Sequence, residues 1–469
     1  MFLLPSIILV YMNGFFCENM FIPNTVLGVR MGRPTTVASS GKRLLPSIVA
    51  ISLVLPLLLA VTVRAADLSA SSSTYLRYYE RELAGGKKNT FAPLYEYLSA
   101  DAANLGGAPV AFHFYGWGRV DLSDASGSGK ESGDLGSAYL EYLHPRGNAQ
   151  MKLGRFFLAE GVAVETLDGG FFKVTTPAGI GISGYGGAPV EHSILDNVST
   201  GNSLYGGRVF FVRPGFVEMG VSYLKEKGPF QGKDRELYGG DLWLRVAGPV
   251  ELTGQAAYNQ STQAMASQRY AVRVVPGSRF DISAGYEAYS YKDLFQTALH
   301  PAFLSPSVDN ADKVQTIFGV LDWEVVSGLT LELAAKNIRH DKANPGNANR
   351  GEAGVRYAFN DRKDVFGLSA AAVTADRDEN EYQEFRGFAT WSPAKFHFSL
   401  DGLTQQYKKE INGKKNATQI VASAGYKVLS SLSVSGDLTY TQSPTFQQDY
   451  AGLLRATLEL GMTPPGGKK

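Results

Sequence analysis

The sequence is poor in residues on which many enzymes and metal proteins depend. Of 469 residues only one is a cysteine, and only 19% are charged. A single thiol excludes a disulfide framework and a thiolate metal cluster within the chain. The charges are balanced, with 45 basic and 44 acidic residues. That balance argues against the basic surface of a nucleic-acid binder, so we expect no nucleic-acid partner.

Glycine and aromatic residues are abundant instead. The chain has 52 glycines, 24 tyrosines and 26 phenylalanines. This composition indicates many strands and turns rather than a helical enzyme.

The N-terminal region looks like an export signal. Lys42 and Arg43 precede an apolar run over residues 44–63, and Val63 and Ala65 fit the small-residue rule for a cleavage site after Ala65. This order of charge, apolar core and small residues is typical of a secretory signal peptide. We predict a cleaved signal over residues 31–65.

A membrane-spanning helix is the alternative for the same run, but Pro56 interrupts a stretch already short for a span. A second apolar run lies in residues 1–30 without a leading positive charge. We predict that residues 1–30 are a mis-annotated extension before a true start at Met31. Cys17 then never reaches the folded protein.

Downstream of about residue 110, short segments alternate between apolar and polar residues. "VELTGQAAYN", residues 250–259, is one example, and such alternation is typical of strands with two different faces. "LLRATLELGM", residues 453–462, also fits a helix, because Arg455 and Glu459 are four residues apart. Helical periodicity appears nowhere over comparable length, so the segment is predicted to be the last strand of the series.

The connections alternate between short and long. Long polar connections separate tight joints, and this rhythm predicts an up-and-down antiparallel meander. The tight joints are residues 213–215, 247–249, 275–278, 326–328, 360–363 and 392–395, and the longer ones are 291–312, 340–350, 375–381, 407–416 and 441–448.

Strands with one apolar and one polar face need two different solvents. In a bilayer the apolar face meets lipid and the polar face lines a lumen. The sheet must then close, because no backbone group can stay unpaired in hydrocarbon. We predict an all-β transmembrane antiparallel barrel around an aqueous channel, with about 18 strands and a range of 16–20.

Residues 109–462 resemble the porin-like β-barrels of Gram-negative outer membranes. The resemblance rests on the alternation, the turn rhythm and aromatic residues near strand ends that look like interface girdles. It implies an outer-membrane location, contact with outer-membrane lipid, insertion by the barrel assembly machinery, and a homotrimer as one option. The girdle residues are Tyr223, Tyr258, Tyr286, Trp323, Tyr357, Trp391, Tyr426 and Tyr440.

Two segments depart from the pattern. Residues 66–108 break the alternation, and a first strand, a periplasmic lead-in and a short plug all stay open. The last strand ends near Met462 and a tail, residues 463–469, follows it. Porin-like barrels usually end on an aromatic residue that the assembly machinery recognises. The different end of this chain therefore concerns the assembly signal more than the barrel fold.

Charged residues on the polar faces are the candidate pore lining. They either solvate the lumen and pair across neighbouring strands, or create a transverse field that selects small polar solutes. The candidates are Arg119, Arg208, Asp241, Arg245, Glu251, Arg273, Glu287, Asp322, Glu324, Glu332, Lys336, Arg356, Arg386, Asp437, Arg455 and Glu459.

Catalytic, cofactor and metal sites are not expected. "GIGISG", residues 179–184, matches a dinucleotide-binding pattern without the strand and helix that the pattern needs, so a strand and turn or an inward loop is expected there. The six histidines show no paired spacing of the kind that binds a metal. The sequence contains neither the Cys-x-x-Cys-His motif of covalent haem attachment nor the Gly-x-Ser-x-Gly motif of serine hydrolases. A hydrolase assembled across strands is left as a minor option.

The sequence therefore predicts a passive outer-membrane channel for small polar or charged solutes. The alternative is a structural sheath around a multihaem c-type cytochrome, since barrel subunits of porin–cytochrome electron conduits are similarly large and poor in cysteine. A wide lumen permits this partner without requiring it.

Overall fold

The computed structural model describes residues 67–83, 88–123, 131–192, 197–199, 202–230, 233–290, 292–293, 312–342, 346–444 and 446–462. The predicted extension (1–30), signal peptide (31–65) and C-terminal tail (463–469) lie outside these ranges, as does Cys17. No helix in the described part of the chain is both long and apolar enough to cross a membrane.

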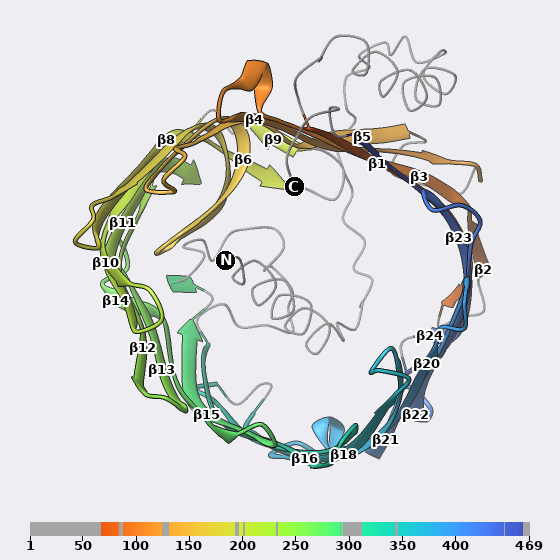
Figure 1. Ribbon diagram of the computed structural model, residues 1–469. Helices are drawn as coiled ribbons and strands as arrows, with labels where there is room; N and C mark the ends of the chain where they lie inside the picture. Colours follow the sequence, from red (N-terminus) through yellow and green to blue (C-terminus); the bar gives the residue numbers. More distant parts are fainter. Residues whose placement is uncertain are drawn as a thin grey trace, which may run out of the picture.

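The strands form one closed antiparallel ring, seen end-on in Figure 1. The ring closes because β1 pairs with β3 on one side and with β24 on the other. The strands are β1 Asp67–Leu83, β2 Lys88–Phe91, β3 Pro93–Ala103, β4 Val110–Asp121, β5 Glu131–Leu143, β6 Ala149–Glu160, β7 Ala163–Thr175, β8 Ile180–His192, β9 Asn197–Ser199, β10 Ser203–Arg213, β11 Val217–Phe230, β12 Lys233–Ala247, β13 Val250–Asn259, β14 Ala264–Gly277, β15 Phe280–Ser290, β16 Lys313–Val326, β17 Leu329–His340, β18 Ala348–Phe359, β19 Asp364–Ala375, β20 Tyr382–Trp391, β21 Phe396–Ile411, β22 Lys414–Lys427, β23 Leu432–Gln442 and β24 Phe446–Met462. Two short 3-10 helices, η1 Leu105–Gly107 and η3 Asp378–Asn380, lie between strands.

The wall of the barrel contains 22 strands. Two of the strand segments add nothing to this number. β2 and β3 pair with successive stretches of β1 and so make one interrupted wall strand. β9 is three residues long and pairs only with β8 among the described residues.

The all-β closed barrel is confirmed, but the predicted count of about 18 strands was too low. The shortfall has a physical cause, because strands without clean alternation were not recognised. β1 carries Ser72 and Thr74 on the same face as Leu68 and Leu76, so its outer face is not uniformly apolar. Residues 67–103, whose role the sequence left open, form the first two wall strands.

The tight joints predicted from the sequence lie at one end of the barrel, the end at which Asp67 and Met462 also lie. The tight turn between β16 and β17 needs glycine, because Gly328 has φ +84° and a side chain there would collide with the Ala358 carbonyl oxygen. The segment 179–184 is ordinary wall, since β8 follows a turn at residues 176–179 and pairs with β7.

The outer face is apolar and carries stacked aromatic pairs near the tight turns. Phe280 lies 5.8 Å from Trp323, and Trp391 lies 5.6 Å from Phe398, measured between ring centroids. Large exposed side chains such as Leu438 (71% exposed) lie on this face between the ends. An apolar band with aromatic residues at its border is the outer surface that a membrane barrel needs.

Candidate functional site in the barrel lumen

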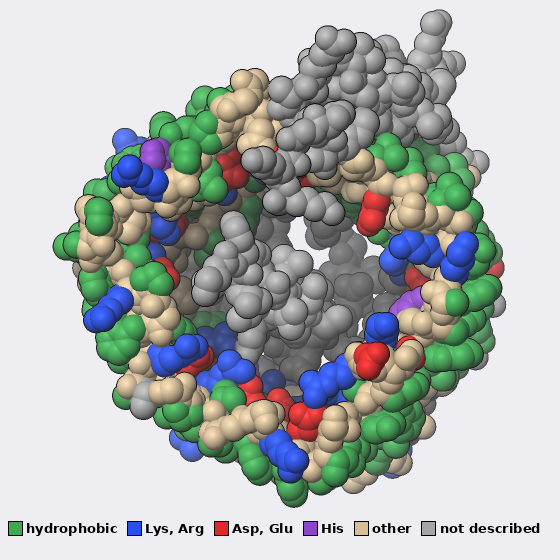
Figure 2. Space-filling view, viewed as in Figure 1, with side chains coloured by type: hydrophobic (Ala, Val, Ile, Leu, Met, Phe, Trp, Pro, Cys, Tyr) green, Lys and Arg blue, Asp and Glu red, His purple; other side chains and the backbone are tan. Residues whose placement is uncertain are grey.

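The structure places the predicted pore-lining residues on the inner face of the wall. They alternate with outward residues such as Leu242, Leu333 and Leu454, which are large, apolar and exposed. Figure 2 shows blue and red side chains gathered along the inner rim of the ring, while hydrophobic ones cover its outside. Their role in lining a pore and their effect on solutes stay predictions.

Most of these residues form ion pairs across neighbouring strands. Arg245 lies 2.5 Å from Glu251, which is also 3.8 Å from Arg273. Farther round the wall, Arg356 lies 2.8 Å from Glu332, and Arg386 lies 2.7 Å from Asp401. We call this arc of alternating charge, on β12 to β21, the charged belt.

The remaining candidates lie at other points of the inner face. Arg119 pairs with Asp121 at 3.5 Å, Arg455 with Asp437 at 3.8 Å, Glu287 with Arg269 at 3.9 Å and Glu324 with Arg362 at 2.6 Å. Asp322 faces Asp281 and Glu332 in the strand register, Lys336 faces Arg350, and Glu459 faces Ser71.

One hairpin leaves the wall and enters the lumen. β5 pairs with β6 only from Ala138 to Leu143, and β7 pairs with β8 only from Leu167 onward. Beyond those points β6 and β7 pair with each other alone among the described residues, up to the turn after Glu160. Figure 1 shows β6 curving inside the ring. We call residues 156–166 the lumen hairpin.

An arginine fills the fork where β5 and β6 part. The Arg155 guanidinium donates to the Leu135 carbonyl oxygen of β5 at 3.0 Å and to both carboxylate oxygens of Asp168 at 2.7 Å. The bond to Leu135 satisfies a backbone carbonyl at an edge that β6 has left, which a buried strand edge requires.

Apolar packing holds the lumen hairpin against the inner wall. Phe156, Leu158 and the neighbouring Leu167 are buried and cluster with wall residues that include Leu204 and Leu224. Gly161, at the tip with φ +61°, lies against Ser222 of β11, whose hydroxyl accepts a bond from the Val162 N–H at 3.1 Å. The hairpin is therefore a packed part of the barrel.

Arg208 is the polar centre of this contact. Its side chain is only 6% exposed and its guanidinium forms ion pairs with Asp241, with Glu218 at 3.2 Å and with Glu160 of the lumen hairpin at 3.5 Å. Glu160 also accepts a bond from the Ser183 hydroxyl at 3.0 Å. Because a buried charge is tolerated only when paired, these residues fix the hairpin in one position.

A second arginine ties the hairpin to β12. Arg235 pairs with Glu165 of the lumen hairpin and lies 3.4 Å from Glu226 of β11. Of the residues in these two networks, the sequence had singled out only Arg208 and Asp241. A signal was present, because "RFFL" at residues 155–158 is apolar at three successive positions and so breaks the alternation of a wall strand. The structure buries Phe156 and Leu158 and leaves Phe157 50% exposed.

The described residues contain no group of three or more side chains suited to hold a metal ion. His113 lies in the lumen, 2.6 Å from Asp101 and 3.2 Å from Glu141. The hydroxyl of Ser392 lies 2.8 Å from Nδ1 of His397 near a tight turn, where His397 is exposed and Ser392 is half-buried. His397 has no carboxylate partner among the described residues, so the pair lacks the third member of a triad.

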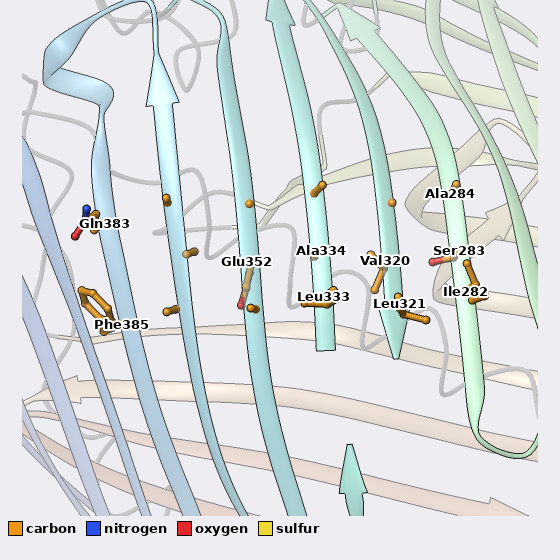
Figure 3. Close-up of a pocket in the computed structure, with 17 residues that line it drawn as sticks. Ile282, Ser283, Ala284, Val320, Leu321, Leu333, Ala334, Glu352, Gln383 and Phe385 are labelled. Atoms are coloured by element: carbon orange, nitrogen blue, oxygen red, sulfur yellow. The ribbon is translucent and has the colours of Figure 1, made fainter. Parts of the chain in front are cut away.

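A hollow of about 820 Å³ lies on the lipid side of the wall, outside the lumen. Small residues such as Gly319, Ala335 and Ala370 line it, between bulkier outward side chains. Figure 3 shows Leu321, Leu333, Phe385 and Ile282 at this hollow on neighbouring strands. Lipid chains meet this surface, so it is separate from the candidate site.

Comparisons with known proteins agree on the architecture. No protein-family model matches the chain, and no curated protein matches it in sequence. Among solved structures, the siderophore receptor PirA from Pseudomonas aeruginosa matches with a TM-score of 0.54 at 13% identity, covering 83% of this chain and 80% of that one.

Two further structures match more weakly. OpdQ from Pseudomonas aeruginosa has a TM-score of 0.42 at 10% identity, covering 86% of this chain and 99% of that one. OccAB2 from Acinetobacter baumannii has a TM-score of 0.44 at 9% identity, covering 84% and 98%. The likeness to the receptor concerns the fold alone. The chain has a closed β-barrel fold like those of Gram-negative outer-membrane proteins.

Proposed function

We propose that the protein is a passive channel for small polar or charged solutes, narrowed from within by the lumen hairpin. The single observation that carries the proposal is the anchoring of this hairpin by Arg208, Arg235 and a buried apolar cluster. A barrel of 22 strands is wide, and barrels of that size hold a plug when they serve as transporters. A fixed hairpin reduces the open cross-section without closing it.

The charged belt gives the proposed channel its solute preference. Its cations and anions alternate around the wall, so the surface attracts ions of both signs and hydrates neutral polar solutes. Its ion pairs are largely exposed, as with Arg386 and Asp401, so water and ions compete for them.

Planar-bilayer recording of the purified protein tests the proposal. We expect steps of ion conductance, and a larger step when residues 156–167 are replaced by Asn-Gly. That replacement joins the register partners Arg155 and Asp168 by a two-residue turn. Replacing residues 407–415 by Asn-Gly shortens another hairpin between the register partners Gln406 and Asn416 and serves as the control.

A wild-type protein that is folded but conducts no ions would contradict the proposal. The cytochrome sheath gives a different result in a second measurement. Purification from native membranes in mild detergent, followed by haem staining, would then detect a haem protein bound to the barrel. A passive channel purifies without one.

A further inference from the structure

One sector of the lumen is aromatic instead of charged. Tyr75 of β1, Tyr95 and Tyr97 of β3 and Tyr115 of β4 all face inward, and we call them the tyrosine patch. They line a cavity of about 830 Å³ whose other wall includes inward residues of β22 to β24. In Figure 1 these strands lie across the ring from much of the charged belt.

The four rings form one continuous surface. Tyr97 is at its centre, with ring centroids 5.4 Å from Tyr75, 6.3 Å from Tyr95 and 6.4 Å from Tyr115. The last two contacts are stacked, and Tyr115 is 40% exposed. An aromatic surface left in contact with water marks a binding site more often than a structural feature.

The polar groups around the patch are hydroxyls. Within the described part of the chain, none of the four phenol groups forms a hydrogen bond, so each can donate to or accept from a solute. Ser71 and Ser99, whose hydroxyls lie 2.7 Å apart, and Thr439 line the same cavity.

Two of the three arginines around the cavity are matched by carboxylates. Arg455 lies over Tyr75 at 5.0 Å and is 3.8 Å from Asp437. Arg119 lies over Tyr95 at 5.8 Å and is 3.5 Å from Asp121. Arg77 lies at the edge of the cavity, 4.8 Å from the ring centroid of Tyr79. The four tyrosines are themselves uncharged, and Arg77 adds one positive charge at the edge of the cavity.

We propose that the tyrosine patch is a binding site for saccharides inside the channel. The C–H groups on one face of a pyranose ring lie against the electron-rich faces of the tyrosines, and its hydroxyl groups bond to the phenols and serines. An aromatic carboxylate would gain the stacking but would leave the hydroxyl-lined wall unused. The inference rests on the proposed function, because solutes reach the patch through the lumen.

Block of the ion current by maltose tests the inference. We expect maltose to reduce the wild-type current, and the Tyr95→Ala/Tyr97→Ala double variant to bind it about tenfold more weakly, from the typical contribution of aromatic pairs. The Tyr95→Phe/Tyr97→Phe variant keeps the rings and loses two hydroxyls, so an intermediate loss is expected. Phe388→Ala, an inward aromatic beside Arg386 in the charged belt, is the control and should leave the block unchanged.

Three results would overturn the inference: no block by maltose, equal block in the alanine double variant, or block by benzoate alone. Each of them leaves the channel itself intact, because ion conductance is recorded in the same experiment. If the wild-type protein conducts no ions, the proposed function fails instead. Maltose binding to the detergent-solubilised protein by calorimetry then decides whether the patch binds sugar.

Discussion

Replacing Arg208 by methionine should release the lumen hairpin. The substitution keeps much of the side-chain volume but leaves Asp241 and Glu218 without their shared cation. Glu160 loses the same cation and keeps its ion pair with Lys173, at 3.3 Å. Removing one partner of a buried ion pair typically costs about 3–5 kcal/mol. At 1.4 kcal/mol for each factor of ten, the ratio of docked to undocked hairpin falls by about 100-fold to about 4,000-fold.

The apolar contacts of Phe156, Leu158 and Leu167 are unchanged in this variant, so the barrel itself should still fold. We expect single-channel recordings of Arg208→Met to show a larger and noisier open current than wild type. Arg386→Met removes a pair in which both side chains are well exposed, worth at most about 1 kcal/mol, and is the matched control. Adding Glu160→Gln to Arg208→Met removes one of the three carboxylates that lose Arg208 and so lowers the repulsion among them, which should restore part of the wild-type current.

The reasoning would be refuted if Arg208→Met and Arg386→Met gave the same open current and noise as wild type. Loss of the folded barrel in Arg208→Met would be detected as a lost shift in gel mobility between heated and unheated samples. In that case the double variant with Glu160→Gln decides, because it carries one buried carboxylate fewer.

Three further predictions concern the hairpin tip, the outer face and the closure of the ring. Gly161→Val should enlarge the current, because a side chain at this position collides with Ser222. Gly215→Val is the control: it has a similar backbone strain (φ +77°) but no atom within 4 Å, so the current should not change. Equal currents in the two variants would contradict the packing of the hairpin tip. Leu438→Arg, on the lipid face, should lower the free energy of unfolding by about 2–4 kcal/mol in denaturant titrations in lipid vesicles. Thr439→Arg, on the lumen face, should lower it by much less. Similar losses in both variants would argue against a wall with lipid on one face and water on the other. Ser73→Cys with Thr457→Cys should form a disulfide between β1 and β24, because the two hydroxyls lie 3.3 Å apart, and peptide mapping that finds two free thiols would argue against closure.

The closed barrel could be predicted from the sequence because strand alternation is a local property. "VELTGQAAYN" at residues 250–259 forms β13 with Glu251 inward, as its pattern indicates. A first strand in residues 66–108 was left open beside a lead-in and a plug, since Ser72 and Thr74 of β1 face outward and donate to Glu96 at 2.5 Å and 2.6 Å. A polar outward face hides the contrast on which the pattern depends.

The candidate site was predictable only in part. The inward position of Arg245, Glu251 and Arg356 followed from alternation, but the lumen hairpin did not. Its inward course depends on contacts distant in sequence, such as Glu165 with Arg235 and Val162 with Ser222. Likewise, the tyrosine patch forms only when β1, β3 and β4 are brought into register.

The central claim is a wall that meets lipid on one face and water on the other, and β24 tests it most directly. Single cysteines at positions 453 to 458 can be placed in a variant without Cys17 and labelled in proteoliposomes with a membrane-impermeant thiol reagent. We predict labelling at positions 453, 455 and 457 and protection at 454, 456 and 458, because Arg455 faces the lumen and Leu454 faces lipid. Equal labelling at all six positions would contradict the account.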